Sequence, residues 1–322
     1  MRQLIRRIVF KVFDLVFRFM LSVMSEETRF KQFSKYSFQI LSWHYYTPIP
    51  DQKDLQYLRD TELVGVNLNT AAALELIDQV VTPYKAEFNA FPLQPTADAL
   101  QFNLINGTHM AIDGNLYYGL IRRHQPRRIV EIGSGNSTLL AAAAIRRNVA
   151  EGKPKSELYA IEPYPSEKLA RIPELTELIS KRVQDVPLSF FQNLQSGDIL
   201  FIDSTHVFRP GGDIWWEYCE ILPRLAPGVM VHIHDISLPK PYPQVYIDNG
   251  WYWNEQWILQ TFLTFNTRFE VLWPGNYLMV NHPDRMKTAF TPEYEQMRAA
   301  FPSSEPTSFW MRVREDKGAP SV

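Results

Sequence analysis

The sequence predicts an α/β fold in which helices cover both faces of a doubly wound, mainly parallel sheet, giving a three-layer sandwich. From Asp113 onward, short apolar runs alternate with helical segments, which is typical of βαβ units. With 45% hydrophobic and 21% charged residues, the composition suits a globular core. The chain has 322 residues, so we expect one core with additions. The expected ranges are an amphipathic helix over 1–24, a helical preface or lid over 25–112, the main domain over 113–282 and a C-terminal extension over 283–322.

The first 24 residues combine an apolar face with charges at three- or four-residue steps, which predicts an amphipathic helix. The charges also interrupt the apolar run, so we do not expect a transmembrane span or a signal peptide, although a targeting peptide stays open. A basic amphipathic helix either lies on an anionic membrane surface or packs on the protein or on a second subunit of a homo-oligomer. Both alternatives stay open. The interrupting residues are Arg6, Arg7, Lys11, Asp14 and Arg18.

Overall charge bears on the class of partner. The 33 Lys and Arg residues nearly cancel the 35 Asp and Glu residues, so the chain lacks the basic field that nucleic-acid binding requires. We expect a small-molecule or glycan substrate and no nucleic acid. Cys219 is the single cysteine and is expected to be buried; without an internal disulfide, the chain is compatible with a reducing compartment, and we expect a cytoplasmic protein, with peripheral membrane contact left open.

The elements follow in order along the chain. Prolines punctuate the segment before residue 100, which shows no alternation of strands and helices and predicts the helical preface. The first βαβ unit starts with a strand over 128–132, a turn over 133–137 and an alanine-rich helix over 138–147. Further strands are expected over 158–161, 181–186, 198–202 and 229–234, and helices over 213–225 and 254–265. The runs 269–273 and 277–280 flank Pro274-Gly275-Asn276, which predicts a closing antiparallel hairpin.

A glycine-rich turn follows the first expected strand. In Glu131-Ile132-Gly133-Ser134-Gly135, the two glycines permit a tight turn and close approach to a ligand, and the helix after them points amide donors at it. A nicotinamide site opens in the same way, but the third glycine of that fingerprint is absent because Thr138 follows Asn136-Ser137. A purely structural turn is the other alternative.

Together with the segments 197–206 and 225–235, this turn resembles the class I S-adenosylmethionine-dependent methyltransferases, in particular those that modify sugars and other small hydroxylated molecules. The resemblance implies a seven-stranded Rossmann-like sheet, S-adenosylmethionine as cofactor and O-methylation of a saccharide or related acceptor. It implies that Glu162 accepts the ribose hydroxyls and that Asp185 faces the adenine amine. The cofactor-binding residues it implies are Glu131, Gly133, Ser134, Gly135, Ser137, Glu162, Asp185 and Asp203.

Two acids end adjacent expected strands, Asp203 and Asp235. In metal-dependent relatives, acids at these positions hold Mg²⁺, which binds the acceptor oxygens. The third ligand there follows the second acid, whereas this chain has Ile236, a departure that leaves the metal open.

Without a metal, a base must take the acceptor proton, and histidine suits that task. His206 and His234 are the candidates, and Asp203 is the third catalytic residue we expect. We favour His206 as the base because it lies on a glycine-containing loop that could swing over the acceptor, with a structural or metal-binding role as the alternative. His232 shares a sheet face with His234 but lies deeper in the strand, so we expect it in the core.

Aromatic residues between Pro239 and Trp257 are expected to form the wall of an acceptor pocket, with a core or a subunit interface as the alternative. Two other functions also stay open at this point. A nicotinamide-dependent oxidoreductase would share the glycine turn and Glu162, and a non-catalytic binding protein would keep the fold without turnover.

Overall fold

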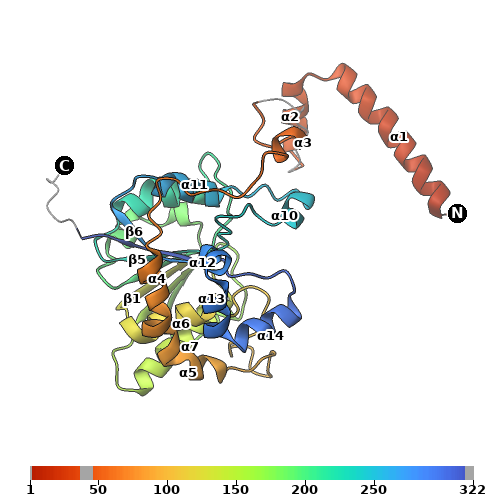
Figure 1. Ribbon diagram of the computed structural model, residues 1–322. Coiled ribbons are helices and arrows are strands. Elements are labelled where there is room, and N and C mark those ends of the chain that lie inside the picture. Colours follow the sequence, from red (N-terminus) through yellow and green to blue (C-terminus); the bar gives the residue numbers. More distant parts are fainter. Residues whose placement is uncertain (1, 37–45, 316–322) are drawn as a thin grey trace. The chain divides into compact units, whose positions relative to one another are not determined.

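The computed structural model describes residues 2–36 and 46–315 (Figure 1). Met1, residues 37–45 and residues 316–322, which fall in the expected ranges 1–24, 25–112 and 283–322, lie outside the described residues. The chain forms two compact units, Met1–Leu58 and Arg59–Val322.

The described part of the first unit contains three helices. The long helix α1 (Arg2–Val23) occupies the expected amphipathic segment. A second helix, α2 (Glu26–Ser34), begins after Ser25, whose Oγ accepts a hydrogen bond from the Thr28 backbone N–H at 3.2 Å. A short helix, α3 (Gln52–Leu55), begins after Asp51, which caps it in the same way. Among the described helices, none has both the length and the apolar character needed to cross a membrane.

The second unit is built on a seven-stranded sheet with the order β3-β2-β1-β4-β5-β7-β6. The first five strands pair in parallel, and β7 pairs antiparallel with both β5 and β6. This confirms the expected seven-stranded, mainly parallel sheet. The strands are β1 (Arg128–Ile132), β2 (Glu157–Ile161), β3 (Leu175–Ile179), β4 (Ile199–Ile202), β5 (Met230–Ile233), β6 (Phe269–Pro274) and β7 (Phe309–Val313).

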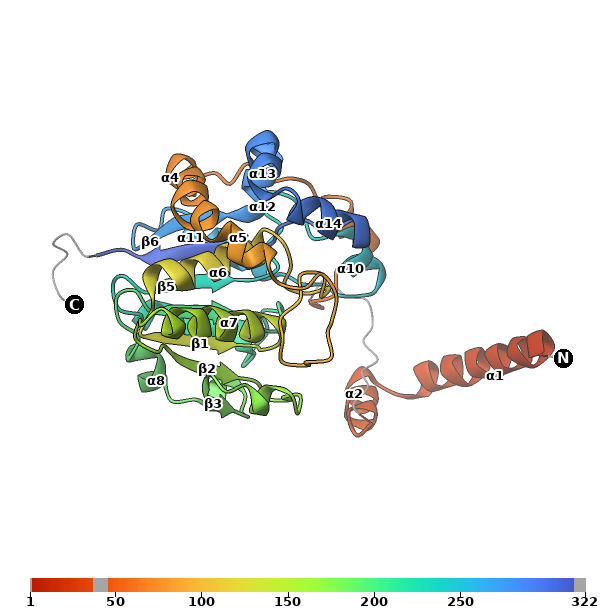
Figure 2. The same cartoon turned by 90° about the horizontal axis from the view of Figure 1, so that it is seen from below.

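Helices cover both faces of the sheet, so the three-layer sandwich is also confirmed (Figures 1 and 2). One apolar core lies between the sheet and the helices α4 to α7 and α12 to α14. The other lies between the sheet and α8, α9 and α11. Because β1, β4 and β5 are buried on both faces, their sequences are nearly continuous apolar runs.

The helices of this unit have the following bounds: α4 (Thr70–Leu76), α5 (Lys85–Asn89), α6 (Asp113–His124), α7 (Asn136–Ala150), α8 (Leu188–Gln192), α9 (Asp213–Trp216), α10 (Gln244–Asp248), α11 (Glu255–Leu263), α12 (Gly275–Asn281), α13 (Pro283–Phe290) and α14 (Glu293–Ala300). A π-helical turn, Glu217–Ile221, and a 3₁₀ turn, Leu222–Arg224, continue α9 through the helix expected over 213–225. Cys219 lies in that π-helical turn and is exposed, so the expectation of a buried cysteine was wrong.

The third strand was expected over 181–186 and lies instead at β3. Residues Val183–Asp185 form a 3₁₀ turn after it. As an edge strand, β3 is only partly buried and carries Glu177 on its exposed side. Its apolar pattern is therefore too weak to stand out in the sequence.

The closing hairpin was wrong in its second strand. Residues 277–280 lie in the helix α12, and the antiparallel partner of β6 is β7, which follows α13 and α14. Gly275 starts α12 where a β-carbon would lie 2.8 Å from the Ser308 carbonyl oxygen, so the proline-glycine pair permits a close crossing of β7 rather than a tight turn. Most of the expected C-terminal extension thus belongs to the main domain.

The expected boundary at residue 112 also differs from the structure. Residues 59–112 belong to the second unit, where α4, α5 and the loop after them fill one core. Ala73, Ile77, Val80, Phe88 and Phe102 are each at most 1% exposed. This segment is therefore part of the fold and not a lid.

Candidate active site

The carboxyl ends of β1, β2 and β4 meet at one edge of the sheet and border a cavity of about 540 Å³. That volume lies within the range of small-molecule pockets, roughly 300–1,000 Å³. Ligands of open α/β sheets bind at this edge. The cavity is lined by Gly133, Glu162, Gln184, Asp203 and Arg209, among others.

Gly133 follows β1 with φ at +81°, in the left-handed region that favours glycine. A β-carbon there would lie 1.8 Å from the Asp203 carbonyl oxygen. The Gly133 N–H donates to the Ile161 carbonyl at 3.0 Å, and the Asp203 N–H donates to the Ile132 carbonyl at 2.8 Å. This glycine therefore lets the ends of three strands close around the cavity.

Glu131 lies beneath the turn and is fully buried. Its carboxylate accepts hydrogen bonds from the Tyr117 hydroxyl at 2.9 Å and from the Thr138 hydroxyl. Burial raises the pKa of Glu131 to about 7 against the opposing effect of these hydrogen bonds. Thr138 Oγ1 also accepts a hydrogen bond from the Gly135 N–H at 3.0 Å. Glu131 is therefore linked through Thr138 to the backbone of the glycine turn.

The other residues of the turn do not line the cavity. Gly135 has φ at 174°, an extended value open to any residue, and a β-carbon there would meet no atom within 4 Å. Ser137 is buried at the start of α7. Ser134 is half-buried, and its hydroxyl has no hydrogen-bond partner among the described residues.

Of the two acids expected after β2 and β3, the structure brings one to the cavity. The carboxylate of Glu162 lines it and accepts from the Tyr164 N–H at 2.9 Å. Asp185 is exposed and lies outside the lining. Its neighbour Gln184 does line the cavity and donates to the Gly211 carbonyl at 3.0 Å.

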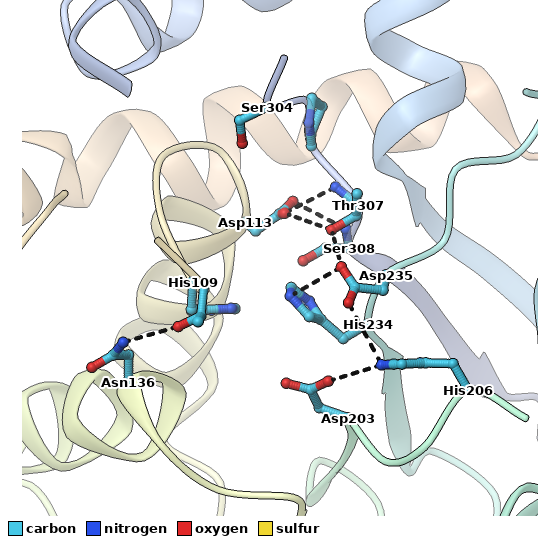
Figure 3. A network of polar contacts seen from close by, with 12 residues as sticks. His109, Asp113, Asn136, Asp203, His206, His234, Asp235, Ser304, Thr307 and Ser308 are labelled. Carbon is cyan, nitrogen blue, oxygen red and sulfur yellow. Dashed lines mark hydrogen bonds and ion pairs between the residues drawn. The ribbon is translucent and has the colours of Figure 1, made fainter. Parts of the chain in front are cut away.

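Beside the cavity, Asp203, His206 and Asp235 converge (Figure 3). His206 Nε2 lies 3.5 Å from Asp203 Oδ1 and 3.5 Å from Asp235 Oδ2. On the other side of the ring, His206 Nδ1 lies 2.8 Å from Glu255 Oε2, and the Trp253 ring stands 4.3 Å away between centroids. His206 and Asp235 have φ of +59° and +54°, uncommon for residues other than glycine and typical of functional sites.

This environment fixes the charge state of the pair. Burial alone would lower the pKa of His206, but Asp203, Glu255 and Asp235 outweigh it and raise that pKa well above its usual value. Burial would raise the pKa of Asp203, yet His234 and His206 lower it to about 2. At neutral pH His206 thus carries a proton and is held by three carboxylates. The expectation that His206 swings over an acceptor as a free base does not agree with this geometry.

The two histidines of β5 and its end have different surroundings, as expected. His232 is fully buried, its Nε2 lies 3.0 Å from Ser308 Oγ, and its ring stacks on Phe201 at 4.0 Å. Its pKa is lowered well below the usual value by burial, so it is a neutral core residue. His234 lies at the strand end, with Nε2 3.8 Å from Asp235 Oδ1.

The sequence did not indicate a second group of residues at this edge. Asp113 accepts from the Thr307 N–H at 2.9 Å and the Ser308 N–H at 3.1 Å, and the Thr307 hydroxyl donates to Asp235 Oδ1 at 3.3 Å (Figure 3). Asp113 lies 194 residues before Thr307, and Asp235 lies 72 residues before it, so no local pattern could pair them. For Glu255 the sequence gives only a weak indication, since it is an acid at the start of the expected helix 254–265.

A family model described as "Methyltransferase domain" matches residues 130–236, the segment that contains Gly133, Glu162, Asp203 and Asp235. The chain thus contains a methyltransferase domain of class I, the S-adenosylmethionine-dependent type. This methyltransferase is 33% identical over 168 residues to an uncharacterized protein of Archaeoglobus fulgidus, in an alignment that covers 48% of this chain and 74% of that protein. The nicotinamide oxidoreductase and the non-catalytic protein are therefore set aside.

The similarity of the chain to solved structures is remote. One match is a Plasmodium falciparum protein, provisionally assigned as a protein-L-isoaspartate O-methyltransferase, in complex with S-adenosyl-L-homocysteine. The identity is 15%, the match covers 52% of this chain and 84% of that chain, and the TM-score is 0.28. At that TM-score the likeness carries no conclusion about the methyltransferase.

Proposed function

We propose that the methyltransferase binds S-adenosylmethionine in the cavity between Gly133, Glu162 and Asp203, and transfers its methyl group to an oxygen of a saccharide or another small hydroxylated molecule. The observation that carries the proposal is the convergence of these three residues at the carboxyl edge of β1, β2 and β4. Gly133 allows close approach of the ligand, and the Glu162 carboxylate suits two neighbouring ribose hydroxyls. Within this proposal, Gln184 takes the place of Asp185 as the polar group beside the adenine ring of the cofactor.

The acceptor belongs on the side where Asp203, His206 and Asp235 converge. Methyl transfer needs an acceptor oxygen in line with the sulfonium and mostly requires positioning and exclusion of water. Because His206 is already protonated and the pKa of Asp203 is lowered to about 2, Asp235 would take the acceptor proton, and His206 would hold these carboxylates in place. Trp253, which contacts His206, extends this side towards Tyr246 and Trp251 and offers aromatic surface for a sugar face.

The expected Mg²⁺ ion fits these residues only in part. Two carboxylates converge as expected, but the position after Asp235 is Ile236, which is 1% exposed, and the third converging donor is an imidazole nitrogen. A metal held by Asp203 and Asp235 would bind the acceptor oxygen and favour its deprotonated form.

The experiment that tests the cofactor site is calorimetric titration of the full chain with S-adenosylhomocysteine. We expect micromolar-range binding that falls at least tenfold in Glu162→Ala, because the variant loses the ribose acceptor, and stays unchanged in the matched control Asp185→Ala. No binding to the wild-type protein, or equal losses in both variants, would contradict the proposed site.

The acceptor class is tested by transfer of a radioactive methyl group from S-adenosylmethionine to mono- and disaccharides. Label in an ether linkage survives mild alkali, whereas a carboxyl methyl ester is hydrolysed. Alkali-stable label on a sugar supports the proposal. Alkali-labile label would instead indicate a carboxylate acceptor.

A further inference from the structure

Three side chains from separate segments each place one donor atom near a common point. They are carboxylate oxygens of Asp203 and Asp235 and Nε2 of His206, all within 4.8 Å of one another. The two contacts of Nε2, each 3.5 Å, are longer than an N–H···O hydrogen bond. Ligand atoms that share one ion at about 2.0–2.2 Å stand roughly 3–3.5 Å apart. The two 3.5 Å separations from Nε2 thus match the spacing of ligand atoms around one ion.

We propose that Asp203, His206 and Asp235 together bind a divalent first-row transition ion, of the class of Mn²⁺, Fe²⁺ and Zn²⁺, in preference to Mg²⁺. Imidazole suits ions of that class, whereas Mg²⁺ demands near-ideal octahedral oxygen ligands. The role of the ion in the reaction rests on the proposed function, because the acceptor oxygen would complete its coordination. Binding of the ion can be measured without turnover.

Glu255 is the positioning residue of this site. It is fully buried, one oxygen lies 2.8 Å from His206 Nδ1, and the other accepts from the Tyr218 hydroxyl at 3.2 Å. A histidine that binds a metal usually donates its other ring N–H to such a carboxylate, which fixes the tautomer and the ring orientation. With Nδ1–H donated to Glu255, the ion would displace the proton of Nε2 and bind the nitrogen lone pair between Asp203 and Asp235.

Charge and an unpaired polar group support the same site. Three carboxylates, of Asp203, Asp235 and Glu255, surround the single His206 ring, an excess of negative charge that a divalent ion would offset. His234 lies beside Asp235, is 4% exposed, and leaves its Nδ1 without a partner among the described residues (Figure 3). Buried polar atoms normally have a hydrogen-bond partner, so this nitrogen calls for a polar group that the described residues do not supply.

The first test uses the wild-type full chain after chelation and dialysis. Mn²⁺ binding is followed by electron paramagnetic resonance, and spin-echo modulation from ¹⁴N reports whether an imidazole nitrogen is a ligand. We expect one bound Mn²⁺ with nitrogen modulation, retained in a tenfold molar excess of Mg²⁺. Absence of nitrogen modulation, or displacement of Mn²⁺ by that Mg²⁺, would overturn the proposal without any variant.

Variants then assign the ligands. His206→Gln is expected to weaken Mn²⁺ binding at least a hundredfold, whereas His124→Gln, at an exposed histidine that lines a cavity at the opposite edge of the sheet, should leave it unchanged. Glu255→Ala should weaken binding about 10- to 100-fold, and Glu255→Gln, which keeps an acceptor for Nδ1–H, should restore part of the loss. Equal affinity in all four variants would contradict the assignment.

Failure of the metal site can be distinguished from failure of the proposed function. If the wild-type protein binds S-adenosylhomocysteine but no Mn²⁺, the metal site is wrong and the cofactor site stands. If it binds Mn²⁺ with a nitrogen ligand but no S-adenosylhomocysteine, the metal site stands and the proposed function is overturned.

An independent observation in the first unit carries a second proposal. On α1, Ile5, Val9, Val12, Val16, Phe19 and Val23 form one stripe at helical spacing, each between 55% and 67% exposed. The opposite stripe carries Arg7, Lys11 and Arg18, and Arg18 pairs with Asp14 at 3.0 Å. We infer that this helix lies on an anionic lipid bilayer surface, because a wide apolar face and a basic polar face suit the headgroup boundary.

The test is co-sedimentation of the full chain with vesicles of phosphatidylcholine alone or with 30% phosphatidylserine. We expect binding to the anionic vesicles that weakens with salt, falls at least tenfold in Phe19→Asp, and falls about fivefold in Lys11→Gln, since one basic residue near such a surface is worth about 1 kcal/mol. The matched control is Lys153→Gln, an exposed lysine in the second unit. Equal binding to both kinds of vesicle would overturn the inference. So would a protein that does not bind vesicles and instead forms a dimer that Phe19→Asp dissociates.

Discussion

Glu131 is fully buried and still able to ionise, which makes the stability of the domain depend on pH. Its pKa in the folded protein is raised to about 7 from 4.5 by burial. In the unfolded chain the acid has lost its proton above pH 4.5, whereas in the folded chain it keeps the proton until about pH 7. The free energy of unfolding therefore falls as pH rises between these values, at about 1.36 kcal/mol per pH unit.

We predict that Glu131→Gln removes this dependence. The stability of the wild-type protein relative to the variant should decrease by about 3 kcal/mol between pH 4.5 and pH 7.5, since the amide keeps an acceptor for Tyr117 and cannot ionise. Urea denaturation of both proteins across this pH range, followed by circular dichroism, measures the difference. A constant difference would show that Glu131 is ionised throughout, stabilised by Tyr117 and Thr138.

Single residues could be predicted from the sequence where the chemistry is local. Gly133 and Asp203 lie next to each other in the fold because each directly follows a strand of a parallel sheet. Their roles at one edge follow from that position. The charge state of His206 could not be predicted, because it depends on Asp235 and Glu255, which come from other segments. Asp185 shows the limit of placement by resemblance, since a shift of one residue brings Gln184 to the cavity instead.

At the scale of elements, the sequence predicts the buried strands correctly but misplaces the edge strand β3. β1, β2, β4 and β5 are marked by apolar runs that both cores require. β3 is half-exposed, so its sequence satisfies neither a buried nor a regularly alternating pattern.

The antiparallel end of the sheet shows a different limit. The sequence of β6 requires an antiparallel neighbour but does not say which segment supplies it. Residues 277–280 have a suitable apolar composition, yet they form α12, and Trp310 of the distant β7 pairs with Trp273 instead. Strand propensity is weak beside such packing, because the buried Trp310 ring is part of the core beneath His232.

At the scale of the whole molecule, the two units differ in whether their residues contribute side chains to the core of the methyltransferase domain. Residues 1–58 form a compact unit of their own, whereas residues 59–112 supply fully buried side chains to the core of the methyltransferase domain. Ile77, Val80 and Phe88 would each leave a gap against α6 or the loop beside it if that segment were absent. The sequence boundary at residue 112 and the structural boundary at residue 58 therefore make opposite predictions for a shortened chain.

We predict that a chain of residues 59–322 folds and binds S-adenosylhomocysteine as tightly as the full chain, while a chain of residues 113–322 does not fold cooperatively. Each large apolar side chain removed from the core costs about 1.5–3 kcal/mol, and Ile77, Val80, Phe88 and Phe102 together reach the whole net stability of a domain, about 5–15 kcal/mol. Thermal unfolding followed by circular dichroism and the calorimetric titration compare both chains with the full protein. A cooperative transition in the shorter chain would show that residues 59–112 are an added layer after all, and a loss of binding in the longer one would mean that the first unit takes part in the cofactor site.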